Sequence, residues 1–163
     1  MNITIKGESF EVPGKQLQKG DQALDFSLQD LADKKYGLAD FAGKPTILTV
    51  VPDINTSVCA IQTKRFNQEA SQIKEINFAT ISNNTKEDQS KWCGQEGVDM
   101  IMLHDPENTF GKAYNIYIPA ADKFNRTVFV LDKSGKIAYV EYVTEMTHEP
   151  NYEKALEVAK SLI

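Results

Sequence analysis

Residues 50–59 have the sequence VVPDINTSVC, and the rest of the chain can be arranged around this stretch. They continue the apolar, largely β-branched run 47–51, which is typical of a short buried strand. Pro52 ends the predicted strand because proline has no N–H to give to a central sheet. The polar residues that follow predict a turn, and Thr56 and Ser57 are both suited to cap a helix.

A helix is predicted from about residue 58 to residue 73. Small and apolar side chains recur there at spacings of four and three, namely Cys59, Thr63, Phe66, Ala70 and Ile73. Cys59 would then lie in the first helical turn, where unpaired N–H groups and the positive end of the helix dipole favour a thiolate. The sequence therefore predicts a potentially reactive cysteine at a strand-turn-helix junction.

The flanking segments extend this junction into an α/β pattern. The predicted elements are a β-hairpin over 3–5 and 10–12, strands at 24–28, 76–82 and 100–103, helices at 86–95 and 109–114, a hairpin over 126–132 and 137–143, and a closing helix with Pro150 at its first position. Consecutive βα units give parallel neighbours, whereas the second hairpin must be antiparallel. We therefore predict one thioredoxin-like domain over 1–163, with a central mixed sheet flanked by helices and an N-terminal β-hairpin extension.

Composition excludes several classes of protein. The chain has 163 residues, is 41% hydrophobic and 25% charged, and carries a net charge of −5. Its Lys and Arg residues are dispersed, so no nucleic-acid partner is expected. Neither an apolar run of about 18 residues, as a membrane span requires, nor the apolar segment of a signal peptide is present. We therefore expect a cytoplasmic protein with no membrane partner.

The chain has two cysteines, Cys59 and Cys93. In a reducing compartment, two thiols indicate either redox chemistry or no special role. The two histidines, His104 and His148, do not lie at metal-ligand spacing from either cysteine, so no metal site is predicted.

Pro52, Thr56 and Cys59 form the pattern Pro-x-x-x-Thr-x-x-Cys, by which the sequence resembles the peroxiredoxins. The run NTSVC at 55–59, the WCG around Cys93, and Arg126 before TVFVLD are similar to the thiol peroxidase subfamily of the atypical two-cysteine kind. The resemblance covers nearly the whole chain. Two departures are Asn55, where the family often has Asp, and Leu24, where it usually has Pro.

The resemblance implies a peroxidase that reduces hydrogen peroxide or organic hydroperoxides without a cofactor. Cys59 would be the peroxidatic nucleophile that becomes a sulfenic acid. Thr56 could donate its hydroxyl to the peroxide or accept from a first-turn amide. Arg126 would favour the thiolate and polarise the substrate, and Pro52 would shield the pocket from water. In the resembled family these four positions form the active site.

Cys93 is implied as the resolving residue, which would form an intrachain disulfide with Cys59. A thioredoxin-like protein would reduce that disulfide, and a homodimer is implied by the same resemblance. Both cysteines fall on predicted helices, and a disulfide needs Cα atoms within about 7 Å. We therefore expect part of each helix to unwind in every cycle.

Other interpretations stay open at this point. The chain could be a peroxide-sensing redox switch that signals through a partner, or a thioredoxin-fold binding module with an unreactive cysteine. A disulfide reductase is disfavoured because the chain has no Cys-x-x-Cys pair. Individually, Arg126 could be a surface residue, Thr56 only a helix cap, and Cys93 a packed thiol beside Trp92.

Overall fold

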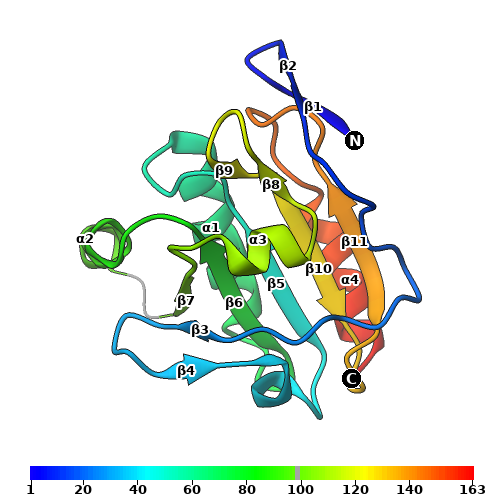
Figure 1. Ribbon diagram of the computed structural model, residues 1–163. Coiled ribbons are helices and arrows are strands. Elements are labelled where there is room, and N and C mark those ends of the chain that lie inside the picture. The colour runs from blue at the N-terminus through cyan, green and yellow to red at the C-terminus, as the bar shows by residue number, and fades with distance from the viewer. Residues whose placement is uncertain (98–99) are drawn as a thin grey trace.

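The computed structural model describes residues 1–97 and 100–163. Its centre is a seven-stranded mixed sheet in the order β11-β10-β5-β6-β7-β3-β4 (Figure 1). The strands are β3 (Leu28–Gln29), β4 (Lys35–Tyr36), β5 (Thr46–Val50), β6 (Asn77–Ser82), β7 (Ile101–His104), β10 (Thr127–Leu131) and β11 (Ile137–Tyr142). The neighbours β5, β6 and β7 are parallel, whereas β10 runs antiparallel to both β5 and β11. The predicted central mixed sheet is confirmed.

Helices cover both faces of this sheet. Figure 1 shows α3 (Thr109–Ala113) in front, with α1 (Ser57–Ala70) and α4 (Tyr152–Ser161) behind, where they contact each other. Side chains of β5 alternate between the two faces: Leu48 packs with Phe110 and Tyr114, and Ile47 packs with Phe66 and Tyr152. The remaining helices are α2 (Lys86–Glu96) and the 3-10 helix η1 (Leu38–Phe41).

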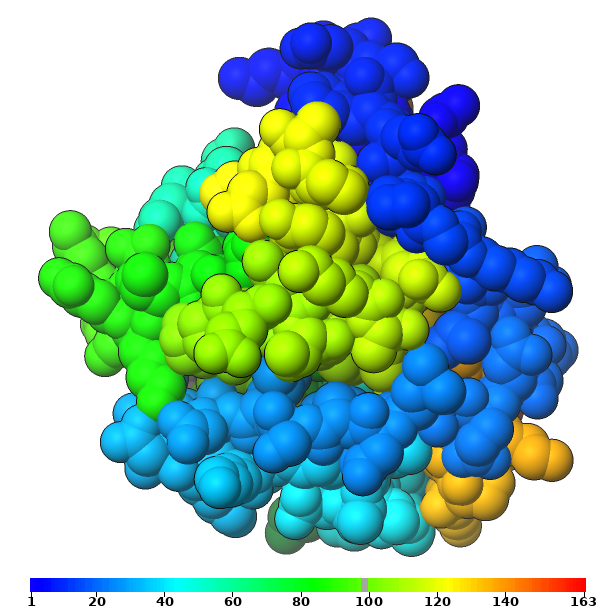
Figure 2. All heavy atoms as spheres, in the orientation of Figure 1, coloured from blue at the N-terminus to red at the C-terminus, as the bar shows by residue number. Residues whose placement is uncertain are grey.

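The predicted N-terminal hairpin is confirmed as β1 (Asn2–Ile5) and β2 (Glu8–Glu11). Its turn residues Lys6 and Gly7 have φ of 51° and 85°, as in the two-residue turns that join the strands of a β-hairpin. The hairpin packs beside a second small hairpin, β8 (Tyr117–Ile118) and β9 (Lys123–Phe124), as Figure 2 shows at the top of the molecule. A shared apolar cluster joins these parts: Ile3, Val12, Ile118 and Met146.

Several predicted boundaries were right because their local signals are strong. α2 begins after Thr85, whose hydroxyl accepts from the Asp88 amide, and ends at Gly97, which has φ 65°. The turn of the hairpin β10–β11 places Gly135 at φ 87°. None of the described helices is long and apolar enough to cross a membrane.

Other predictions about the elements were wrong. α1 ends at Ala70 instead of residue 73. The strand expected at 24–28 is irregular up to Leu28, because the Asp25 carboxylate accepts from the Phe26 and Leu38 amides and takes the place of a ladder partner. Pro150 precedes α4, whose capping residue is Asn151.

Candidate active site

The loop after β5 and the start of α1 place the predicted cysteine. Thr56 has the extended backbone of a helix-capping residue, with φ −89° and ψ 152°. Cys59 follows in the first turn of α1, as predicted, and its side chain is fully buried. The backbone N–H of Asp53 donates to Cys59 Sγ at 3.5 Å. A peptide dipole therefore points its positive end at the sulfur.

Thr56 closes the turn that leads into this helix. Its hydroxyl donates to the Asp53 carbonyl at 2.8 Å, and its own N–H donates to the same carbonyl at 3.0 Å. The hydroxyl makes no capping hydrogen bond, so the predicted acceptance from a first-turn amide is wrong. The other predicted role, donation to the peroxide, would require the proton to leave the Asp53 carbonyl. Because a hydroxyl that donates its one proton keeps its lone pairs, Thr56 Oγ1 can accept from an O–H group in the adjacent pocket.

Arg126 is buried, with 2% of its surface exposed, so the surface interpretation is wrong. Its Nε and Nη2 donate to the Met146 carbonyl at 3.1 and 2.5 Å, and Nη1 donates to Gln62 Oε1 at 2.8 Å. These acceptors are neutral, and none of the ion pairs among the described residues involves Arg126. Its guanidinium therefore keeps its positive field available to an anion in the site.

A pocket of about 320 Å³ lies against these groups. Pro52, Thr56 and Arg126 all line it, so the structure brings three of the predicted site residues to one cavity. Cys59 is buried beside the same wall, since the lining residue Asp53 donates its backbone N–H to Sγ. Ile5 contributes to the wall from the N-terminal hairpin. The pocket can therefore hold a small polar molecule with an apolar substituent, although Cys59 itself is not among its described lining residues.

Cys93 lies on α2 and is partly buried. It packs against the apolar cluster that contains Cys59, Trp92 and Met102. Both cysteines are reduced in the structure. The fold therefore brings the two sulfur-bearing residues to one cluster while it keeps them on separate helices.

Sequence reasoning missed the residues that support these groups. Gln62 is fully buried on α1 and holds Arg126. Asn84 follows β6, accepts from the Ile54 N–H at 2.9 Å and donates to Asp53 Oδ1 at 2.9 Å. Gln62 could have been suspected, because it falls three residues after Cys59 on the face that points to the core. Asn84 lies in a polar turn and gives no comparable signal.

The Asp53 carboxylate is the acidic group of this site. Partial burial by itself raises the pKa of Asp53, but hydrogen bonds from Asn84 and the Asn55 amide, together with the Lys123 ammonium, outweigh it. The pKa therefore lies below its usual value, and the group is ionised at neutral pH. Lys123 Nζ lies 3.3 Å from Asp53 Oδ2.

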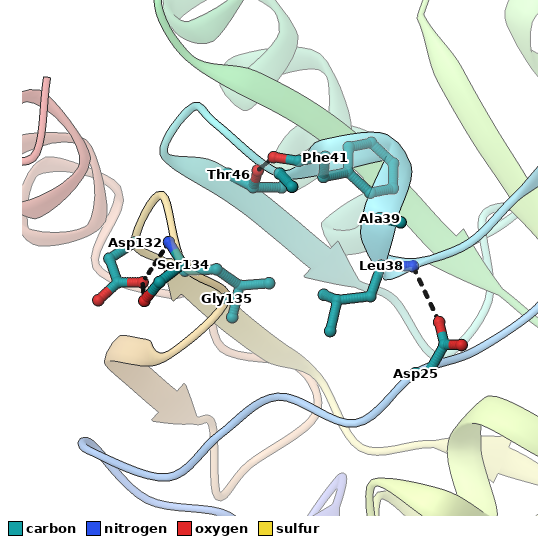
Figure 3. A pocket seen from close by; sticks show the side chains of 10 residues that line it. Asp25, Leu38, Ala39, Phe41, Thr46, Asp132, Ser134 and Gly135 are labelled. Atoms are coloured by element: carbon teal, nitrogen blue, oxygen red, sulfur yellow. Dashed lines mark hydrogen bonds between the residues drawn. The ribbon is translucent and has the colours of Figure 1, made fainter.

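A second hollow of about 300 Å³ lies between η1 and the β10–β11 turn (Figure 3). The two carboxylates in its lining already accept hydrogen bonds from backbone amides. Asp25 accepts from the Leu38 N–H, and Asp132 accepts from the Ser134 and Lys136 N–H groups. Its lining contains no thiol and no cation. Elsewhere, no group of three or more His, Cys, Asp or Glu side chains in the described part of the chain is placed to hold a metal ion.

The sheet topology and the buried thiol at a helix start define a thioredoxin-like thiol protein. The family model AhpC/TSA matches residues 19–140. The chain is 44% identical over 163 residues to a thiol peroxidase of Bacillus subtilis, covering 99% of this chain and 98% of the relative. It is 44% identical over 162 residues to a thiol peroxidase of Streptococcus pneumoniae, with 98% and 99% covered.

Solved structures agree. A peroxiredoxin-like protein from Aquifex aeolicus matches with a TM-score of 0.93 at 26% identity, covering 99% of this chain and 97% of that one. A thiol peroxidase from Chromobacterium violaceum matches with a TM-score of 0.87 at 14% identity, covering 99% and 96%, which shows the shared fold. The chain belongs to the AhpC/TSA family, among the peroxiredoxin enzymes that include the thiol peroxidases. The thioredoxin-like fold prediction is thereby confirmed.

Proposed function

We propose that this chain reduces hydrogen peroxide and organic hydroperoxides with Cys59 as its nucleophile. The observation that carries the proposal is one pocket that Thr56 and Arg126 line, with the buried Cys59 sulfur directly behind its lining residue Asp53. The Arg126 guanidinium has no ion-pair partner among the described residues. Its relatives of similar length are named thiol peroxidases, which supports the same activity.

The first step breaks the O–O bond of the hydroperoxide. The Cys59 thiolate attacks one oxygen, an S–O bond forms, and an alkoxide or hydroxide leaves and takes a proton from water. The Cys59 sulfur loses two electrons and becomes a sulfenic acid, and the peroxide gains these two electrons. Arg126 stabilises the negative charge on the oxygens, and Thr56 Oγ1 accepts from the peroxide O–H and thereby orients it. Pro52 excludes water because it presents no N–H.

Cys93 completes the cycle in this proposal. Its thiolate attacks the Cys59 sulfur, an S–S bond forms as the S–O bond breaks, and the sulfenic oxygen leaves as hydroxide, which takes a proton from the solvent. A dithiol protein of the thioredoxin type then supplies two electrons and restores both thiols. Packing of both cysteines against one apolar cluster supports this pairing, and their separate helices require local unwinding. We further propose that the enzyme acts as a homodimer in the cytoplasm.

Peroxide consumption with thioredoxin recycling tests the function in wild type, Cys59→Ser and Cys93→Ser. We expect Cys59→Ser to abolish the reaction. Cys93→Ser, a matched change in the same cluster, should keep one stoichiometric turnover and lose recycling. Full activity of Cys59→Ser would end the proposal. Slow recycling combined with tight binding of another protein in one redox state would indicate the redox switch instead.

A further inference from the structure

The candidate pocket contains an ion pair whose members come from distant segments. Lys123 is on β9 and Asp53 follows β5, yet Nζ and Oδ2 lie 3.3 Å apart. The two side chains are 38% and 25% exposed, and both line the pocket. Among the described lining residues Asp53 is the one carboxylate. Lys123 therefore neutralises the one carboxylate of the described pocket lining.

Asp53 is also the residue whose backbone touches the reacting sulfur. Its N–H donates to Cys59 Sγ, and its Oδ1 accepts from Asn84 Nδ2 at 2.9 Å and from the Asn55 N–H at 3.0 Å. These contacts hold the carboxylate in a fixed place on the residue whose N–H donates to the sulfur. A fixed negative charge there disfavours a thiolate unless a cation cancels it.

The charged groups around Cys59 can be named from each neighbouring element. The N-terminal hairpin contributes Lys6, the loop after β5 contributes Asp53, β9 contributes Lys123, and Arg126 stands immediately before β10. From α2, the titratable group packed against the same cluster is Cys93. Of these described cations, Lys123 is the one that forms an ion pair with Asp53.

We propose that Lys123 is a positioning residue for the Cys59 reaction. It cancels the charge of Asp53, the residue whose peptide N–H donates to Sγ. The thiolate then forms beside a positive peptide dipole and a neutral ion pair. This inference rests on the proposed function, since it assumes that Cys59 is the thiol that reacts.

The test follows thiolate formation directly. In a Cys93→Ser background Cys59 is the single cysteine, and its ultraviolet thiolate absorbance is recorded against pH. Lys123→Met should move the midpoint to higher pH and lower the thiolate fraction at neutral pH roughly three- to tenfold. Asp53→Asn combined with Lys123→Met should restore the parent curve, because both charges are then gone. Lys123→Gln, which keeps a donor but no charge, should behave like Lys123→Met.

Lys64→Met is the matched control. Lys64 lies on α1 with Cys59 and pairs with Glu96 at 3.2 Å, but it does not line the pocket. Its loss should leave the thiolate curve unchanged. The proposal is overturned if Lys123→Met or Lys123→Gln titrates like the parent, if the double variant stays displaced, or if Lys64→Met gives the same displacement. Because absorbance reports ionisation without peroxide, a chain without peroxidase activity would still give a clear answer.

Discussion

Gln62 is the buried side chain that holds the guanidinium of Arg126 from α1. Its Oε1 accepts from Nη1 at 2.8 Å, and its Nε2 donates to Thr49 Oγ1 at 3.4 Å. Gln62 is 0% exposed and Arg126 is 2% exposed, so water cannot replace the lost acceptor without rearrangement. Gln62→Met keeps the volume of the side chain and removes the acceptor.

The magnitude follows from the charge on the donor. A buried hydrogen bond to a charged group contributes about 1.5–3 kcal/mol, and a size-matched substitution adds little cavity cost. With a urea dependence of about 2 kcal/mol per molar, the unfolding midpoint should fall by roughly 1 M. Because Arg126 loses one of its two anchoring residues, the rate of peroxide reduction should fall as well.

Urea unfolding and peroxide kinetics on Gln62→Met and Gln62→Glu separate the two effects. Gln62→Glu keeps an acceptor for Arg126 and should therefore keep the stability. Its carboxylate offsets the guanidinium charge, so its peroxide rate should nevertheless fall. If the unfolding free energy of Gln62→Met lies within about 0.5 kcal/mol of wild type, the hydrogen bond from Arg126 to Gln62 does not stabilise the fold, because substitutions at ordinary surface positions have effects of that size.

Three further predictions concern other parts of the site. Hydrogen bonds from the Thr147 side chain, the Thr147 amide and the Gly7 amide lower the pKa of Glu145 to about 2. The ionised Glu145 carboxylate stabilises the fold above its usual pKa, and this contribution is lost as pH falls toward 2. The stability of Glu145→Gln should therefore depend less on pH than that of wild type below pH ~4.5, as measured by circular dichroism during acid unfolding. An unchanged acid transition would contradict this. Thr56→Val should slow peroxide reduction on the order of a hundredfold, whereas Thr56→Ser should stay near wild type in the same assay; equal rates would exclude an orienting hydroxyl. Oxidation should lower hydrogen-exchange protection across 56–63 and 88–96, and identical protection in both redox forms would rule out unwinding.

Much of the fold could be predicted because its signals are local. β5 and β10 are unbroken apolar runs, and Thr85 and Gly97 mark both ends of α2. The hairpin β8–β9 was not predicted, since strands of two residues show no periodicity. The segment before β3 has a strand-like pattern, but its backbone is satisfied by the Asp25 side chain. No sequence window contains that information.

The candidate site divides in the same way. Pro52, Thr56 and Cys59 belong to one short stretch, so their joint placement follows from a strand, a turn and a helix start. The partners of Arg126 could not be predicted, because the Met146 carbonyl lies beyond β11 and its acceptance depends on the folded loop. Likewise, the pairing of Asp53 with Lys123 requires β9 to be placed beside the pocket. These contacts are tertiary, and spacing along the chain does not encode them.

In the proposed reaction, the sulfur of Cys59 takes one oxygen atom from the peroxide. Peptide mass spectrometry on Cys93→Ser, treated with one equivalent of hydroperoxide and trapped with a sulfenic-acid reagent, measures this directly. We expect one added oxygen on Cys59 for each peroxide consumed, and no reaction in Cys59→Ser. Peroxide consumption that leaves Cys59 unmodified would contradict it.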